Sequence, residues 1–177
     1  MKKNILAING SASDNSSNLA IIRRIADLVG DKFNVTVYED LTKLPHFKTE
    51  LTDSKTPEEI QQFRKAVSKA DGVLICTPEY VFSIPSGLKN ALEWCVSTTV
   101  FSEEPVGLIT ASASGTKGHE ELKLIMKTIE AKFTEETTLL IPGVKGKVAR
   151  NGDISDAETE NNLMNLVESF VRMLEKG

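Results

Sequence analysis

The residues best suited to chemistry stand in a short polar stretch near the N-terminus. An apolar run, Ile5 to Ile8, leads into a loop that begins at Gly10, and a helical pattern starts near Leu19. Backbone N–H groups at a helix start bind anions together with short polar side chains. The hydroxyl and amide side chains that we expect at the anion are Ser11, Ser13, Ser16, Ser17 and Asn18.

Three common phosphate-binding patterns are missing from this first loop. A P-loop requires Lys and then Ser or Thr after its second glycine, and a dinucleotide fingerprint requires three glycines. Gly10 is the loop's one glycine, and there is no cysteine to act as a phosphatase nucleophile. A monophosphate held by neutral donors remains. The alternative is a turn that only caps the following helix. A cap needs one polar side chain, whereas this loop has several.

A second loop, Thr77–Gly87, combines two prolines with two aromatic residues. The prolines stiffen its ends, and the remaining N–H groups are available to the carbonyls and ring nitrogens of a planar heterocycle. Tyr80 and Phe82 are able to pack on an aromatic ligand, although such residues are more often core or interface residues. For Glu79 the alternative is a solvated or capping carboxylate.

A third loop, Ala111–Gly118, is made of small residues that let the backbone approach a ligand. The alternative is an ordinary turn between a strand and a helix. We expect His119 to be a surface residue at a helix start and His46 to lie in a loop, with no catalytic role for either. The candidate ligand contacts in this loop are Ser112, Ser114 and Gly115.

Apolar runs alternate with amphipathic stretches along the chain, which predicts a parallel sheet with helices on both faces. The predicted strands are 5–8, 35–38, 73–76, 106–109 and 139–141, the second of them at an edge. Apolar residues at helical spacing follow in 19–29, 60–67, 88–95, 122–133 and 163–174. Thr56 is expected to cap the helix that starts at Pro57, and Ser155 or Asp156 the last helix. Because ligands bind at the carboxyl ends of parallel strands, the three loops are expected to form one site.

Bulk properties restrict the function further. The chain has 177 residues, which predicts a single domain over 1–177, and its net charge of −4 argues against nucleic-acid binding. No stretch has the length of a membrane span, and the N-terminal apolar run is too short for a signal peptide. Cys76 and Cys95 are expected to be buried free thiols. Together these features predict a cytoplasmic protein with neither a nucleic-acid nor a membrane partner.

Two of the loops resemble the motifs of a known family, the NADPH-dependent FMN reductases. Gly10-Ser11-x-Ser13-x-x-Ser16-x-Asn18 resembles its motif Gly-Ser-x-Arg-x-x-Ser-x-Asn. The segment from Pro78 to Trp94 resembles its second motif, Pro-Glu-Tyr-Asn-x-Ser-x-Pro-x-x-Leu-Lys-Asn-Ala-x-Asp-Trp. The second motif is long and specific, and the agreement in length, order and spacing covers nearly the whole chain.

The resemblance implies a flavodoxin-like three-layer α/β sandwich, with a five-stranded parallel sheet in the order 2-1-3-4-5, that binds FMN non-covalently. The first loop would take the FMN phosphate, and the third would close the other side of the site. Lys89, Asn90 and Trp94 would order the second loop and its helix. The residues implied at the isoalloxazine ring are Pro78, Glu79, Tyr80, Val81 and Ser83.

The implied activity is transfer of two electrons from NADPH or NADH to a small-molecule acceptor, by a ping-pong mechanism and in a homodimer or homotetramer. Quinones, azo compounds, nitro compounds and flavins are the implied acceptors. Ser13 stands where the family commonly has Arg, which makes NADH use more credible, and Val81 replaces the common Asn. The alternatives are a flavodoxin-type electron carrier and a flavin-free binding or regulatory module on the same fold.

Overall fold

Five parallel strands form one sheet in the order β2-β1-β3-β4-β5, the predicted flavodoxin-like order. The structure is a computed structural model that describes residues 2–13, 16–38, 40–52, 55–149 and 151–176. The predicted edge position of the second strand is confirmed. The strands are β1 Lys3–Asn9, β2 Phe33–Tyr38, β3 Gly72–Thr77, β4 Val106–Ser112 and β5 Thr138–Pro142.

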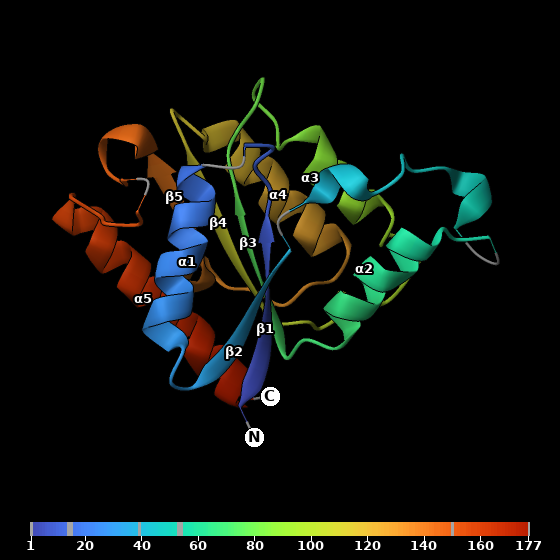
Figure 1. Cartoon of the computed structure of the whole chain (residues 1–177), viewed down its shortest axis with the longest axis horizontal. Helices are drawn as coiled ribbons and strands as arrows, with labels where there is room; N and C mark the ends of the chain where they lie inside the picture. The colour runs from blue at the N-terminus through green and yellow to red at the C-terminus, as the bar shows by residue number, and fades with distance from the viewer. Residues whose placement is uncertain (1, 14–15, 39, 53–54, 150, 177) are drawn as a thin grey trace.

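Helices cover both faces of the sheet, as the alternating pattern predicts. The helices α1 and α5 lie on one side of the sheet, and α2, α3 and α4 lie on the other (Figure 1). Each follows a strand in the chain, so every connection is a crossover of the βαβ kind. Their bounds are α1 Ser17–Val29, α2 Glu58–Ser68, α3 Ser86–Glu93, α4 Thr116–Thr128 and α5 Ala157–Lys176.

The three central strands are buried on both faces, which explains their nearly continuous apolar runs. In β3, Leu74 and Cys76 join the core under α1 and α5, whereas Val73 and Ile75 join the core under α2, α3 and α4. Strand β1 alternates in the same way. The sheet therefore separates two apolar cores. Packing on both faces fixes the positions of the strand ends.

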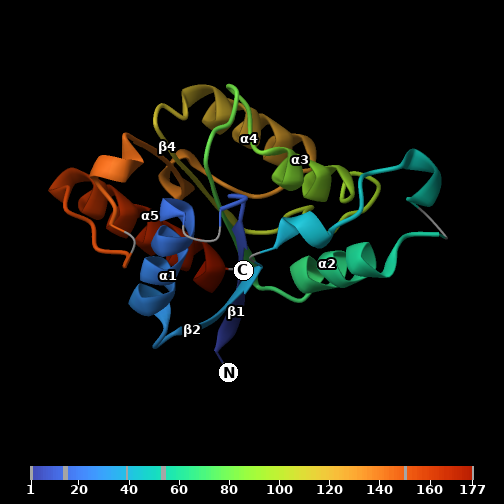
Figure 2. The ribbon, with the colours of Figure 1, turned by 45° about the horizontal axis from the view of Figure 1, so that its top comes forward.

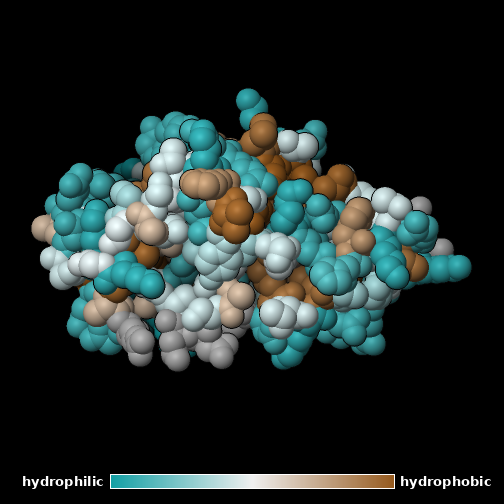
Figure 3. All heavy atoms as spheres, turned by 90° about the horizontal axis from the view of Figure 1, so that it is seen from above, coloured by the Kyte–Doolittle hydropathy of each residue, from teal (hydrophilic) through white to brown (hydrophobic). Residues whose placement is uncertain are grey.

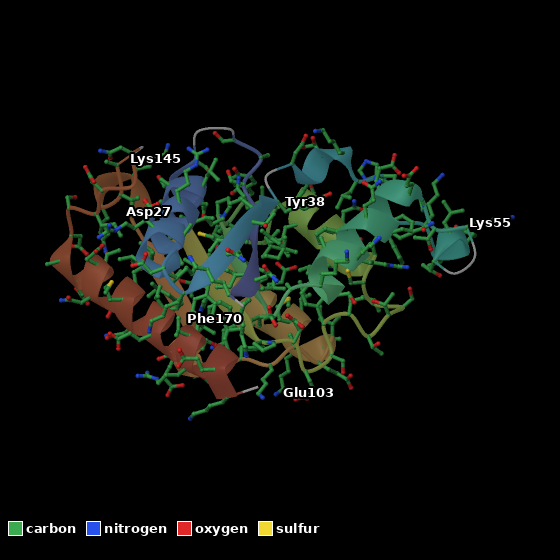
Figure 4. All side chains as sticks on the ribbon, turned by 60° about the horizontal axis from the view of Figure 1, so that its bottom comes forward. Asp27, Tyr38, Lys55, Glu103, Lys145 and Phe170 are labelled. Atoms are coloured by element: carbon green, nitrogen blue, oxygen red, sulfur yellow. The ribbon has the colours of Figure 1, made fainter. Side chains whose placement is uncertain are left out.

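Gly72 lets the last helix pack closely on the sheet. Figure 4 labels Phe170 on α5, and a Cβ at Gly72 would lie 3.1 Å from its ring and 2.4 Å from Leu174. A Cβ at Gly107 would lie 3.6 Å from the same ring. A side chain at Gly72 would therefore push α5 outward, whereas one at Gly107 would make an ordinary contact with Phe170 and lie 3.0 Å from Leu74 in the neighbouring strand.

Several helix ends differ from the sequence-based expectation. Pro57 takes the N-cap position of α2, which begins one residue later than predicted. At α5 the expectation is confirmed: of the two expected residues Asp156 is the cap, because its carboxylate accepts from the Thr159 amide at 2.9 Å. The third helix ends at Glu93, before Cys95.

Helix α4 ends at Thr128, five residues before Phe133, because Glu130 adopts a left-handed backbone with φ of 62°. The Ala131 amide donates to the Met126 carbonyl at 3.0 Å, and the Glu130 amide to the Lys127 carbonyl at 3.1 Å. This is a Schellman C-cap, usually signalled by glycine. Glutamate at the left-handed position gives no such signal, so the sequence pattern runs on past the end.

Of the helices in the described part of the chain, none is both long and apolar enough to cross a membrane.

Candidate functional site

Three loops meet at the carboxyl edge of the sheet, where β1, β3 and β4 end (Figure 2). Asn18 connects them from inside, because its amide donates to the Ala111 carbonyl at 3.1 Å and accepts from the Cys76 thiol at 3.3 Å. Its side chain is buried with 3% exposure. The Asn18 side chain thus orders the loop from within the protein, and the residue can offer a ligand only its backbone.

The first loop folds back on the sheet at Gly10, where a Cβ would lie 2.4 Å from the Thr77 hydroxyl oxygen. Ser11 is buried, and its hydroxyl oxygen accepts from the amide of the exposed Ser13 at 3.2 Å. Ser16 caps α1 by accepting from the Leu19 amide at 3.1 Å. The capping alternative therefore applies to Ser16, while the other serines have no capping bond in the described structure.

The start of α1 carries unsatisfied donors. The amides of Ser17 and Asn18 have no acceptor among the described residues, as expected for the first turn of a helix. Ser17 is half-buried. These amides carry the positive end of the helix dipole, so this position suits a phosphate.

The second loop contains a tight turn in an unusual conformation. The amide of Tyr80 donates to the Ser83 carbonyl at 2.9 Å, and the Ser83 amide donates back at 3.1 Å. Between them Val81 and Phe82 both have positive φ, 53° and 60°, as in a type I′ turn. Valine is a rare residue in this left-handed region because its Cβ is branched.

The same turn presents apolar side chains and free amides to the outside. Val81 is 94% exposed and Phe82 77% exposed, and the exposed apolar group continues with Tyr80. Seen from above, the molecule shows apolar side chains at the surface near the middle of this face (Figure 3). No described residue accepts from the amides of Val81 or Phe82. The turn therefore offers both hydrogen-bond donors and an apolar surface.

The first and third loops both contact the second. The hydroxyl oxygens of Ser11 and Tyr80 lie 3.5 Å apart, and Ser112 donates to the Glu79 carbonyl at 3.3 Å. Gly115 has φ of 89°, a conformation that glycine adopts without strain, and Ser114 beside it is exposed. Pro78 is buried at the end of β3.

Two carboxylates join the second loop to α4. Glu79 accepts from the Gly118 amide at 2.8 Å and from the Gly115 amide at 3.3 Å, so it caps this helix. Glu121 accepts in the opposite direction, from the Ser83 hydroxyl at 2.6 Å and the Ile84 amide at 3.2 Å. Of the two interpretations of Glu79, the capping carboxylate is therefore the one that matches its hydrogen bonds.

A pocket of about 1090 Å³ opens between the first two loops, the start of α3 and the segment Asp40–Phe47. This segment lies outside the three loops predicted from the sequence. It follows β2, whose carboxyl end lies at the same sheet edge, so the same rule about strand ends would have found it. Its lining residues beyond the predicted loops include Asp40, Thr42, His46, Lys89 and Glu93.

Helix α3 holds this segment in place. The Asn90 side chain accepts from the Phe47 amide at 2.8 Å and donates to the Pro45 carbonyl at 3.0 Å. The Trp94 indole donates to the same carbonyl at 2.7 Å. Asn90 and Trp94 therefore order the wall of the pocket, whereas Lys89 pairs with Glu93 at 3.0 Å on the surface.

His119 is half-buried, which corrects the expectation of a surface residue. Its Nδ1 lies 3.0 Å from the Thr110 hydroxyl oxygen. Burial lowers the pKa of this imidazole, and the nearby Lys123 lowers it further. The neutral form of this histidine is thus the favoured one, and its contact with Thr110 ties α4 to strand β4. Among the described residues, no group of three or more histidine, cysteine or acidic side chains could hold a metal ion.

Comparison with known proteins identifies the family. A model of the family described as NADPH-dependent FMN reductase matches residues 3–145. The NADH-dependent flavin reductase subunit 2 of Lactobacillus johnsonii is 31% identical, with 98% of each chain covered. A 2-hydroxy-1,4-benzoquinone reductase from a Burkholderia species is 27% identical, over 96% of this chain and 95% of that protein.

Solved structures agree on the fold. The flavoenzyme NAD(P)H:(acceptor) oxidoreductase FerB from Paracoccus denitrificans superimposes with a TM-score of 0.76 at 21% identity, covering 98% of each chain. The chain therefore belongs to the NADPH-dependent FMN reductase family and is a flavodoxin-like oxidoreductase that uses FMN and a reduced nicotinamide nucleotide.

Proposed function

We propose that the protein transfers two electrons from NADH through FMN to quinone, azo, nitro or flavin acceptors by a ping-pong mechanism. The observation that carries this proposal is the pairing of two donor sets at one sheet edge. Free amides at the start of α1 suit a phosphate, and free amides in the Val81–Phe82 turn suit the carbonyls of a planar ring. FMN has both parts.

The donors at the site suit FMN in chemistry, and the pocket of about 1090 Å³ beside them offers space for a ligand. The first loop would hold the phosphate with Ser11, Ser13, Ser16 and the α1 amides, and the second loop would hold the ring. Bound FMN supplies the acceptance and release of a hydride equivalent, so the protein needs no nucleophile of its own. The chain's contribution is to bind, orient and shield the cofactor.

The charges around the pocket support NADH as the preferred donor. Lys89 is the one cationic residue that lines the described pocket, and Glu93 pairs with it at 3.0 Å. Asp40 also lines the pocket, and its carboxylate pairs with Lys43 at 3.3 Å. The 2′-phosphate that distinguishes NADPH from NADH would find no unpaired cation here.

We also propose that a second copy of the chain covers the exposed apolar turn, giving a homodimer. Val81 and Phe82 lie at the tip of one loop, and two apolar side chains this exposed are unusual in a monomer. The active enzyme is expected in the cytoplasm, where its two buried free thiols stay reduced. Light scattering on the purified protein measures the oligomeric state, and a monomer at micromolar concentration would contradict the dimer.

The central experiment is spectroscopic. The protein is titrated with FMN, and NADH or NADPH is then added to separate anaerobic samples. We expect bound FMN to bleach, faster with NADH, and initial-rate plots against a quinone to give parallel lines. A protein that binds no FMN would contradict the proposal. A stable blue semiquinone with no reduction by either nucleotide would instead favour the electron carrier.

A further inference from the structure

The turn at Val81 and Phe82 is closed by the Tyr80–Ser83 backbone pair, yet its two central residues do not favour the left-handed conformation that they adopt. A two-residue turn of this kind favours Asn followed by Gly, whereas here a β-branched residue and an aromatic residue occupy both positive-φ positions. Both side chains point into solvent, with 94% and 77% exposure. Within one protomer, packing of these side chains therefore provides little of the free energy that this conformation requires.

Hydrogen bonds on either side of the turn join it to helix α4. Before the turn, the Glu79 carboxylate bonds to two amides at the start of α4, at 2.8 and 3.3 Å. After the turn, Glu121 of α4 bonds to the Ser83 hydroxyl at 2.6 Å and the Ile84 amide at 3.2 Å. One carboxylate reaches from loop to helix and the other from helix to loop, so both stems of the turn are tied to one rigid element.

Gly118 lets the helix come close enough for these bonds. A Cβ at this position would lie 3.2 Å from the Glu79 side chain and 3.4 Å from the Ser83 carbonyl oxygen. No described Lys or Arg lies within ion-pair distance of Glu79 or Glu121. Both carboxylates are therefore committed to loop and helix donors rather than to salt bridges.

We infer that Glu79 and Glu121 are positioning residues that hold the Val81–Phe82 turn in a strained conformation suited to the flavin ring. This inference rests on the proposed function, because the ring is the ligand that the turn is held for. Glu121 belongs to neither of the loop motifs. It acts through Ser83 and Ile84, without touching the cofactor.

The test removes the Glu121 bonds while leaving the α4 cap in place. Glu121→Ala frees the stem after the turn, so Val81 and Phe82 relax toward ordinary backbone conformations in the flavin-free protein. We expect the dissociation constant for FMN, measured by quenching of flavin fluorescence, to rise about tenfold, the loss expected for hydrogen bonds to a charged group. Glu121→Gln keeps an acceptor oxygen and is expected to bind FMN more tightly than Glu121→Ala.

Asparagine at the strained position provides a rescue. Because Asn tolerates the left-handed region, Val81→Asn in the Glu121→Ala background should restore FMN binding to within about threefold of the wild type. Glu120→Ala is the matched control. Glu120 is the exposed neighbour on α4 that pairs with Lys117 at 2.8 Å, and its removal should leave FMN binding unchanged.

A second readout needs no flavin. Amide NMR signals of Val81 and Phe82 should shift in Glu121→Ala but not in Glu120→Ala. The inference is overturned if Glu121→Ala binds FMN as the wild type does, if its turn signals do not move, or if Val81→Asn fails to rescue binding. If wild-type protein binds no FMN, the proposed function fails, and the NMR comparison still decides whether Glu121 holds the turn.

Discussion

Gly10 stands at a position where no side chain fits. A Cβ there would lie 2.4 Å from the Thr77 hydroxyl oxygen and 3.1 Å from the Leu88 side chain. We predict that Gly10→Ala lowers the free energy of unfolding by about 1–3 kcal/mol, the usual result of overpacking. Because the first loop turns at this residue, FMN binding should weaken as well. Urea unfolding and an FMN titration measure the two effects.

Gly146 gives the matched control for that substitution. Nothing lies within 4 Å of a Cβ built on it. Gly146→Ala should change the free energy of unfolding by less than about 0.5 kcal/mol, as surface substitutions usually do. If both substitutions lowered the free energy of unfolding equally, the close contact with Thr77 would not be the reason that Gly10 excludes a side chain.

The roles of single residues in the first loop were only partly predictable. A serine before a helical run is a known cap, and Ser16 caps α1. Asn18 looks like its polar neighbours in the sequence, yet its side chain is buried against Cys76 and Ala111. These two partners lie 58 and 93 positions away, so local sequence carries no sign of them.

At the scale of elements, helix α3 and the segment Asp40–Phe47 form one wall of the pocket. Asn90 makes two hydrogen bonds across this contact and is 9% exposed. We predict that Asn90→Ala lowers the free energy of unfolding by about 2–3 kcal/mol, because the Phe47 amide and Pro45 carbonyl lose a partner. Hydrogen exchange at the Phe47 amide should accelerate.

Lys89→Ala is the comparison for this helix. The Lys89–Glu93 pair is two-fifths exposed on both sides, so its loss should change stability by less than about 0.5 kcal/mol. If Asn90→Ala and Lys89→Ala unfold at the same urea concentration, Asn90 does not fix the segment.

The strands and helices themselves were predictable, since their signals are local and periodic. Apolar runs gave all five strands within a few residues, and the alternation with helices gave the layers. The turn at Val81 and Phe82 was not predictable, because neither residue favours the left-handed backbone. Its conformation depends on Glu121, which is 38 positions from Ser83 in the chain. Local patterns thus determine the elements, while long-range contacts shape the site.

The two ends of the sheet differ at the scale of the whole molecule. The carboxyl edge holds the three loops, and the opposite edge holds an acidic pair, Glu104 before β4 and Asp71 before β3. Glu103, next to Glu104 in the chain, is labelled at the lower edge of Figure 4. Glu104 has a buried carboxylate oxygen with no hydrogen-bond partner in the described structure. A charge on Glu104 therefore affects the free energy of unfolding but lies far from the three loops.

Burial, and then the charge of Asp71, raises the pKa of Glu104 to about 7. In the unfolded chain this carboxyl titrates near its ordinary value of 4.5. The native state therefore binds more protons than the unfolded state between these two values. It follows that the free energy of unfolding falls as the pH rises from about 4.5 to about 7, and that the loss is complete above the native pKa.

Glu104→Gln removes this titration. Because the side chain is half-buried and water screens part of the effect, we predict that the variant is more stable than the wild type by about 1–2 kcal/mol at pH 8, and equal to it near pH 4.5. Urea unfolding of both proteins at intervals across this range measures the difference, with Glu59→Gln on the exposed start of α2 as the control. A stability difference that stays constant with pH would show that Glu104 is not the group responsible. FMN binding should be unchanged throughout, because this residue lies at the end of the sheet away from the loops.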